Sequence, residues 1–365
     1  EFDSKKIMKG FPPPSEYQVT LANWREPGIS RWSFSHVRQI LPTAPIEAPQ
    51  NSARLLRELQ NLSELPFTFE DKTHQLGKFL EKSQTDAFLV MRKGKVVHEW
   101  YDGWGAAARP HIVFSVSKSL TSLLVGILVS KAVLDPNKPI KSYLPETSGS
   151  AYEGATLRNV LDMTVASTFT EDYLDSTGVF MAYRRASAWN PLDAGEKTNG
   201  LRPFLSSLPA SDGNHGHRHH YCSPHTDLLG WIIERTTGES YFTLFSDYLM
   251  HPVGAETDGY VTLDGFGAPR PAGGICLAPQ DLLRLAEMVR CHGVANGQQI
   301  VPEDWVADFR GFDDSAPWRR QVDGPRHFPN GAYRSKWYRT GFEDDEFCAI
   351  GIHGQWIWVN PKREV

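Results

Sequence analysis

The stretch from Ser115 to Val133 constrains the fold more than any other part of the sequence. Apolar residues recur through it so often that they would occupy most of the surface of a helix. The positions that carry this pattern are Leu120, Leu123, Leu124, Ile127 and Leu128. Such a helix must be covered on several sides, so we expect it in the middle of the protein. Its longest apolar run is far shorter than the ~20 residues needed to span a bilayer.

Strand-like segments lie on both sides of a helix-rich middle third. Two apolar runs around a Lys-Gly turn predict a β-hairpin, and proline-rich, aromatic sequence at the start predicts an extended wrapping segment. Helical spacing and end signals such as Gly238 predict several helices. The expected strands are 87–101 (the hairpin), 259–263, 349–352 and 356–359, and the expected helices include 55–62, 226–237 and 279–293.

This order of elements predicts an α/β (α+β) architecture in which one sheet is assembled from both ends of the chain. We expect a single catalytic domain over 1–365. Its sheet subdomain is expected at about 20–135 and 255–365, and a helical insertion at about 136–254.

Composition excludes several classes of protein. The 365 residues include 38 Lys and Arg against 43 Asp and Glu, a net charge of −5, which argues against a nucleic-acid binder and against a protein of anionic membrane surfaces. Four scattered cysteines are too few for a disulfide framework, and no signal peptide is visible. A reduced, cytoplasmic location is therefore expected.

One catalytic pattern is present, the S-x-x-K of Ser115-Val116-Ser117-Lys118, which occurs once in the sequence. Residues i and i+3 share a helix face, so the Ser115 hydroxyl and the Lys118 amine can meet. The helix N-terminus would stabilise negative charge on the serine oxygen, and burial would lower the lysine pKa so that a neutral amine can act as a base. The alternative is a helix-capping serine followed by a surface lysine.

Two further elements fit the same chemistry. Tyr221, ahead of the helix at 226–237, could relay a proton between serine, lysine and leaving group, although a packed tyrosine is the simpler reading. The glycine-flanked Ile352-His353 pair lies on an expected strand. A backbone N–H there, together with that of Ser115, would form an oxyanion hole, and the alternative is a β-bulge.

These elements, in this order, resemble the serine β-lactamase/penicillin-recognising superfamily, and most closely its class C-like esterases and the 6-aminohexanoate-dimer (nylon-oligomer) hydrolases. With the second group the similarity runs along the whole chain. It includes Trp24-Arg25-Glu26-Pro27, 85–90, 111–120, 160–163, Glu171-Asp172-Tyr173, Tyr221-Cys222-Ser223, 227–235 and 351–355. The resemblance implies a β-lactamase/transpeptidase-like fold, with an antiparallel sheet flanked by helices and a mostly helical subdomain.

The resemblance also implies roles for individual residues. Ser115 would be the acylated nucleophile, Lys118 its base and Tyr221 the proton relay, with the oxyanion held by the N–H groups of Ser115 and Ile352. The substrate would be contacted by Tyr173, Arg184, Trp189, Tyr338 and His353. Other tryptophans, such as Trp100, Trp104, Trp318 and Trp337, are expected in the core or the pocket wall.

Several positions depart from that pattern. The usual Y-x-N reads Tyr221-Cys222-Ser223, and no K-T-G triad exists, with Ala349 near its lysine position, so efficient β-lactamase activity is not expected. Arg184 stands where efficient nylon-oligomer hydrolases carry an acid, and Ala272 where they carry a polar residue. An arginine would repel a substrate ammonium and suits an anionic or neutral substrate. Family members also continue with another strand and a helix, which the sequence to Val365 lacks.

Five histidines cluster just before the expected 226–237 helix. They are His215, His217, His219, His220 and His225. Such density can bind zinc, yet carboxylate or cysteine ligands are not spaced beside them, apart from Cys222. We expect a solvated loop at the entrance near Tyr221, no metal site, and no organic cofactor.

The sequence therefore predicts a serine hydrolase that cleaves esters or amides of small molecules through an acyl-enzyme on Ser115, with a carboxylesterase favoured. A linear-amide (6-aminohexanoate-oligomer) hydrolase, an acyltransferase and a non-catalytic, acylatable sensor are the alternatives. A small-molecule substrate is expected, no nucleic-acid or membrane partner, and a homodimer is one option for assembly.

Overall fold

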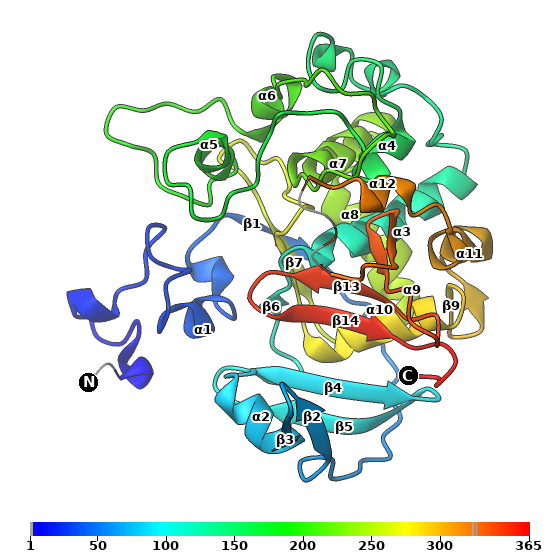
Figure 1. Ribbon diagram of the computed structural model, residues 1–365. Coiled ribbons are helices and arrows are strands. Elements are labelled where there is room, and N and C mark those ends of the chain that lie inside the picture. Colours follow the sequence, from blue (N-terminus) through cyan, green and yellow to red (C-terminus); the bar gives the residue numbers. More distant parts are fainter. Residues whose placement is uncertain (1–2, 323–324, 326) are drawn as a thin grey trace.

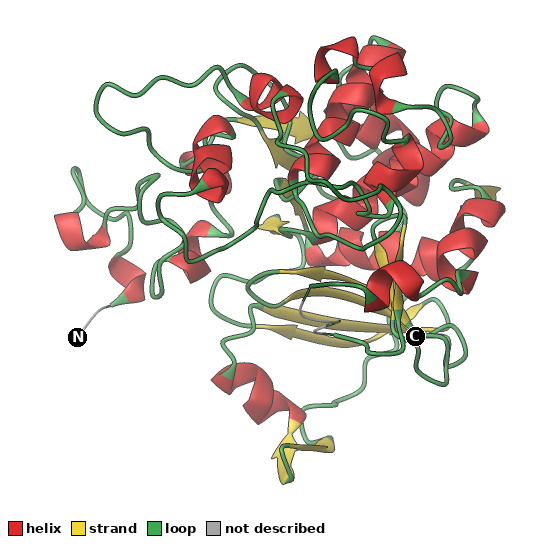
Figure 2. Ribbon diagram, turned by 45° about the horizontal axis from the view of Figure 1, so that its top comes forward, coloured by secondary structure: helices red, strands yellow, loops and turns green. Residues whose placement is uncertain are grey.

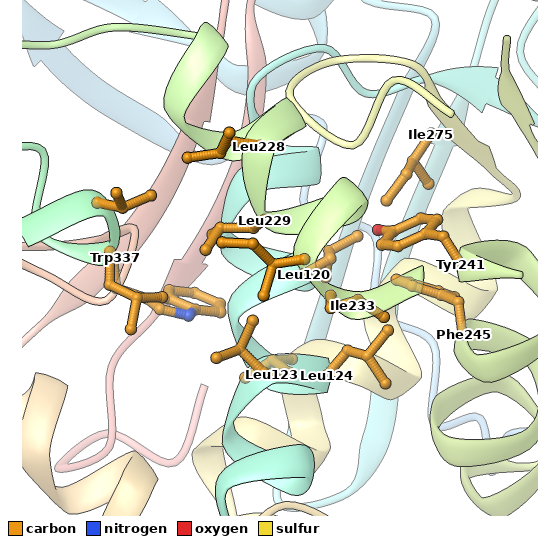
Figure 3. Close-up of a cluster of buried hydrophobic side chains, with 14 of the residues drawn as sticks. Leu120, Leu123, Leu124, Leu228, Leu229, Ile233, Tyr241, Phe245, Ile275 and Trp337 are labelled. Carbon is orange, nitrogen blue, oxygen red and sulfur yellow. The ribbon is translucent and has the colours of Figure 1, made fainter. Parts of the chain in front are cut away.

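Helix α3 (Val116–Ser130) runs through the middle of the computed structural model, which describes residues 3–322, 325 and 327–365 (Figure 1). Every residue from Val116 to Leu128 is buried. The helix packs against α7 (Pro224–Thr237) and against strands β13 (Phe347–Gly351) and β14 (Gln355–Val359). Figure 3 shows leucines of α3 and α7 meeting side chains from other elements in one apolar cluster. The predicted central, buried helix is confirmed.

The remaining elements follow the chain in order. The strands are β1 (Thr43–Ile46), β2 (Pro66–Phe69), β3 (Lys72–Gln75), β4 (Ala87–Arg92), β5 (Lys95–Tyr101), β6 (His111–Ile112), β7 (Gly259–Thr262), β8 (Ile275–Leu277), β9 (Val294–Ala295), β10 (Gln298–Gln299), β11 (Ala332–Arg334) and β12 (Trp337–Arg339). The helices are α1 (Ser30–Ser33), α2 (Leu76–Lys82), α4 (Leu157–Leu161), α5 (Val179–Ala186), α6 (Leu201–Ser206), α8 (Tyr241–Phe245), α9 (His251–Val253), α10 (Pro279–Arg290), α11 (Glu303–Gly311) and α12 (Ala316–Arg319). Shorter helical turns are η1 (Ser4–Lys6), η2 (Ser15–Tyr17), η3 (Val37–Gln39), η4 (Ile140–Ser142), η5 (Pro145–Thr147) and the π-helical η6 (Ser246–Met250).

Among the described residues, two four-stranded antiparallel sheets are accompanied by the two-stranded sheets β2-β3, β4-β5 and β9-β10. The orders of the four-stranded sheets are β1-β7-β8-β6 and β11-β12-β13-β14. The first sheet joins strands from both ends of the chain, as expected. The second comes from the C-terminal third alone, so the expectation of one sheet is wrong among the described residues. Figure 2 shows helices gathered above the stacked strands, and the predicted architecture of antiparallel strands flanked by helices is confirmed.

The predicted hairpin is confirmed as β4 and β5. Lys93 and Gly94 both have positive φ, +52° and +74°, as a tight two-residue hairpin turn requires. Figure 1 shows this hairpin beside β14, and helix α10 packs against both β4 and β14. The predicted helices at 226–237 and 279–293 are confirmed as α7 and α10, and Gly238 ends α7 with a left-handed φ of +73°.

The expected helix over 55–62 is wrong. This segment instead runs along the edge of β5, where Val96 N donates to Leu56 O at 2.8 Å and Glu58 N donates to Val96 O at 2.9 Å. Leu56 and Leu59 are 67% and 56% exposed. Pairing with an open strand edge satisfies the backbone, and no buried face is left for a helix to pack.

Before β1 begins at Thr43, the described N-terminal residues form loops and short helical turns rather than the expected extended segment. They still contribute buried aromatics: Trp24 packs edge-on against Trp189, with ring centroids 5.3 Å apart, and donates from Nε1 to Trp189 O at 3.1 Å. The N-terminal segment thereby builds one wall beside the start of α3.

The segment from Ile140 to Val253 contains the helices α4 to α9 and their short helical turns. The division into sheet and helical subdomains stays a prediction. Among the described residues, the helices are too short or too polar to serve as membrane spans.

Gly126 tests how tightly α3 is packed. A Cβ built on this glycine would lie 2.5 Å from the Trp305 ring of α11. We expect Gly126→Ala to lower the free energy of unfolding by about 1–3 kcal/mol, because the buried ring or the helix must move. Gly311→Ala is the matched control, since Gly311 is an exposed helical glycine with nothing within 4 Å of a built Cβ. Urea denaturation of both variants measures the difference, and equal stabilities would contradict this packing.

Candidate active site

Ser115 and Lys118 meet at the start of α3. Lys118 Nζ donates to Ser115 Oγ at 2.8 Å, and donates a second hydrogen bond to Ala272 O at 2.6 Å. Strand β6 leads the chain to this point, and Val113 N still pairs with Ile275 O before the helix begins. Phe114 has a φ of +44°, a left-handed conformation that is strained for an aromatic residue. This backbone turn places the serine hydroxyl at the helix N-terminus.

Lys118 is only 1% exposed. Burial lowers the pKa of its amine to about 8, with Arg270 acting in the same direction and the carboxylates of Glu171 and Asp227 opposing. The alternative of a surface lysine is therefore wrong. A buried amine with this pKa is substantially neutral near pH 8, which is the state a base requires.

Tyr221 lies next to the lysine, just before α7. Its ring centroid is 5.0 Å from Lys118 Nζ. Burial raises the pKa of the Tyr221 phenol well above its usual value, with neighbouring tyrosines and Glu171 adding to the effect. The phenol therefore stays protonated at neutral pH, so it is suited to passing a proton on and not to acting as a phenolate base.

The end of β13 approaches Ser115 from the other side. A Cβ built on Gly351 would lie 2.6 Å from Val113 O and 3.1 Å from Ser115 N, so only glycine permits this approach. Ile352 follows in the turn to β14, where the strands stay in register from Gly351 opposite Gln355. This is a hairpin turn and not the alternative β-bulge. Ile352 and Ser115 line the same pocket, and the oxyanion role of the Ile352 N–H stays a prediction.

A pocket opens beside Ser115 and encloses about 360 Å³, including its part open to solvent. Of the sequence-predicted residues, Tyr173, Arg184, Trp189 and Ile352 line it with Ser115. Lys118 lies buried behind the serine, and Tyr221 beside it is half-buried.

Two predicted substrate contacts lie outside this lining, among the described residues. Tyr338 belongs to an aromatic cluster with Tyr333 and Trp318, at centroid distances of 4.7 Å and 5.8 Å. His353 packs on Phe34 and Phe114, 5.0 Å and 5.1 Å away. Their substrate roles stay predictions.

Glu171 is a pocket residue to which the sequence interpretation gave no role. Its carboxylate accepts hydrogen bonds from Ser223 N and Ser223 Oγ, both at 2.8 Å, and from Tyr173 OH at 2.5 Å. Glu171-Asp172-Tyr173 was part of the family resemblance. Its position in the sequence does not indicate that Glu171 accepts hydrogen bonds from Ser223.

Asp227 positions the loop that holds the lysine. Its Oδ1 accepts from Ala272 N at 2.9 Å, and its Oδ2 accepts from the Tyr183 hydroxyl. Since Ala272 O in turn accepts from Lys118, this carboxylate fixes the lysine through one residue of backbone. Burial raises the pKa of Asp227 to about 6, against the opposing effect of Arg270, whose Nε is 3.9 Å away.

The histidine cluster divides: 212–214 and 216–217 are exposed, as expected of a solvated loop, but two of the five histidines are buried, which the expectation missed. His219 is buried between Trp318 and Tyr333, and His225 is buried with its Nδ1 3.2 Å from Tyr152 OH. Aromatic side chains pack around both histidines and explain why they are buried. The density of histidines in the sequence gives no sign of these aromatic neighbours. Among the described residues, side chains of His, Cys, Asp and Glu do not come together in groups able to hold a metal ion.

The family assignment rests on the greater part of the chain. A family model described as Beta-lactamase matches residues 76–365. The chain belongs to the beta-lactamase family. The predicted family and fold are thereby confirmed, and the comparisons place the chain among hydrolases of this family.

Similar proteins extend the match into the N-terminal segment. A 6-aminohexanoate-dimer hydrolase of Paenarthrobacter ureafaciens is 33% identical over 354 residues, which cover 97% of this chain and 88% of the relative. A Bacillus anthracis protein assigned as a 6-aminohexanoate-dimer hydrolase superposes with a TM-score of 0.88 at 24% identity, covering 96% and 90% of the two chains. A family VIII carboxylesterase gives a TM-score of 0.59 at 15% identity, over 79% and 87%.

In this beta-lactamase-family chain, Asp227→Ala tests the positioning of the lysine loop. The change removes the acceptor of Ala272 N–H and the Tyr183 hydroxyl, and leaves Arg270 buried without a carboxylate. We expect a loss of about 2–5 kcal/mol of unfolding free energy. Asp193→Ala, which removes an exposed partner of Arg185, is expected to cost less than about 1 kcal/mol. Equal midpoints in denaturation would refute the buried role of Asp227.

Proposed function

We propose that this protein is a serine hydrolase that cleaves carboxylic ester bonds of small molecules through an acyl-enzyme on Ser115. The observation that supports it most is the 2.8 Å hydrogen bond between a fully buried Lys118 amine and the Ser115 hydroxyl, at the mouth of a pocket. A buried amine beside a hydroxyl is the arrangement by which a neutral base activates a nucleophile.

In the acylation step, Ser115 Oγ attacks the ester carbonyl carbon while its proton passes to neutral Lys118 Nζ. The carbonyl π electrons move onto oxygen, and the N–H groups of Ser115 and Ile352 stabilise that charge. When the carbonyl reforms, the bond to the alcohol oxygen breaks. That oxygen takes a proton from Lys118 through the Tyr221 phenol, which accepts one proton as it donates its own.

Deacylation repeats the sequence with water. Lys118, again neutral, takes a proton from water as the water oxygen bonds to the acyl carbon. The bond to Ser115 Oγ then breaks, the serine oxygen takes back a proton from protonated Lys118, and the carboxylic acid leaves. Each step is balanced by the groups of the site and one water molecule.

Hydrolysis of a linear amide is the second candidate, favoured by the 33% identity to a 6-aminohexanoate-dimer hydrolase over most of both chains. The ester reading rests on Arg184 in the pocket lining, which would repel the ammonium of an amino-acyl substrate. Parallel assays of p-nitrophenyl butyrate and of the 6-aminohexanoate dimer separate the two, because an amide hydrolase turns over the dimer at a comparable or higher kcat/KM.

Ser115→Ala tests the nucleophile. We expect the rate of p-nitrophenyl butyrate hydrolysis to fall by at least about a thousandfold, and labelling by a fluorophosphonate, read by mass spectrometry, to disappear. Ser130→Ala, at the opposite end of α3, is the matched control and should retain both. Parent-like ester hydrolysis by Ser115→Ala would overturn the proposed mechanism.

The pH dependence tests the base. Because burial lowers the Lys118 pKa to about 8, the amine is protonated and inactive as a base well below that pH, and neutral above it. We expect kcat/KM for p-nitrophenyl butyrate to rise about tenfold per pH unit on the acidic side and to level off above about pH 8. A profile that is flat, or that falls between pH 6 and 9, would contradict Lys118 as the base. Rates of Ser115→Ala supply the background correction.

A further inference from the structure

We propose that the pocket beside Ser115 binds a carboxylate of the substrate, so that preferred esters carry a free acid group besides the bond that is cleaved. This inference rests on the proposed function, because it names the substrate class of the same site. Three guanidinium groups carry it: Arg25, Arg184 and Arg270 line the pocket together with the nucleophile. They come from the N-terminal segment, from α5 and from the loop before β8.

Arg270 is buried without adequate partners. The residue is 4% exposed, yet Nε and Nη1 have no hydrogen-bond acceptor among the described residues. The guanidinium stacks on Trp189, 3.5 Å from the ring centroid, a contact that supplies no acceptor in the plane of its N–H groups. Asp227 is 3.9 Å from Nε and already accepts from two other donors. Unsatisfied N–H groups make a buried cation costly, and a carboxylate bound in the pocket would bring a further counter-charge to this guanidinium.

Arg184 is also without an ionic partner within the described part of the chain. Its guanidinium lies over the rings of Phe180 and Tyr173, 4.3 Å and 5.8 Å from their centroids. The next residue along α5 behaves differently, because Arg185 pairs with Asp193 at 2.7 Å and Glu196 at 3.1 Å. The arginine facing the pocket is thus left available, and its neighbour is neutralised.

Arg25 is the third arginine of the pocket, and the acceptors of its hydrogen bonds are uncharged. It donates to Trp189 O at 3.1 Å and to the side-chain oxygen of Asn190. These contacts orient its guanidinium without neutralising it. Burial lowers the pKa of Arg25 to about 9, and the positive charges of Arg184 and Arg270 act in the same direction.

The acid in the described pocket lining does not balance these charges. Glu171 faces three arginines, and its oxygens already accept from Ser223 and Tyr173. The positive field reaches beyond the lining, because burial and then Arg25 and Arg184 lower the pKa of His353. An ammonium group would be repelled here, whereas the planar guanidinium forks match a carboxylate.

Three p-nitrophenyl esters with the same six-carbon acyl chain test the inference: the hemiadipate, the hexanoate and the 6-aminohexanoate, which end in carboxylate, methyl and ammonium. The corresponding eight-carbon esters vary the distance between the cleaved bond and the terminal group. Butyrate esters of 6-hydroxyhexanoate and of hexanol test a carboxylate on the alcohol side. On the acyl side or on the alcohol side, we expect the ester that ends in a carboxylate to exceed the ester that ends in a methyl group in kcat/KM by roughly tenfold. Of the three acyl-side esters, the ammonium ester should have the lowest kcat/KM. The side that shows the preference identifies where the substrate acid lies.

Substitutions on α5 assign the effect. Arg184→Gln should lower the carboxylate-to-methyl ratio of kcat/KM by roughly tenfold, and Arg184→Asp should shift the preference towards the ammonium ester. Arg185→Gln is the matched control, and should keep the parent ratio. A parent preference for the methyl esters on both sides, or equal effects of Arg184→Gln and Arg185→Gln, would overturn the inference.

Binding separates this inference from the proposed function. Adipate is titrated calorimetrically into Ser115→Ala, with and without Arg184→Gln. Adipate binding that weakens roughly tenfold in the double variant supports the anion site even if esters are not cleaved. Ester hydrolysis that depends on Ser115, without adipate binding or carboxylate preference, rejects the anion site and leaves the proposed function intact.

Discussion

The site depends on how Lys118 is held: its amine donates one hydrogen bond to Ser115 Oγ and a second to Ala272 O. An amine removed from water must find acceptors, and these two fix its position on the serine. Burial supplies both the orientation and the lowered pKa. The nucleophile and its base are therefore products of the same packing that makes α3 the centre of the fold.

That packing extends outward through backbone. Asp227 on α7 holds Ala272, and Gly351 lets β13 come within reach of Ser115 N. The α7 helix and the β13 strand both pack on α3, so the helix is a common reference for the groups around the serine. The Asp227 carboxylate and Gly351, far apart in sequence, are placed near the Lys118 amine because the helix and the strand that carry them pack on α3.

The sequence could predict what is local. A serine and a lysine three residues apart on an apolar helix meet by helix geometry alone, and the hairpin at 87–101 follows from its Lys-Gly turn. It could not predict that Arg25 and Arg270 converge on Arg184, because that meeting depends on how three distant segments fold together. The expected helix over 55–62 failed for a similar reason, since the edge of β5 offers backbone partners that leucine spacing does not reveal.

Two departures from the family pattern, the missing lysine near Ala349 and the arginine at 184, have a common physical explanation. The family resemblance implies a lysine near Ala349, yet Ala349 is buried in β13 opposite Ile357, where an ammonium would be removed from water at a cost. The positive charge of this pocket comes instead from arginines on the N-terminal segment, α5 and the loop before β8. Nucleophile and base lie on the rigid core, and the charged lining lies on segments that pack around it. A change of substrate charge therefore requires no change in the core, which explains how the scaffold can be kept while the pocket lining differs.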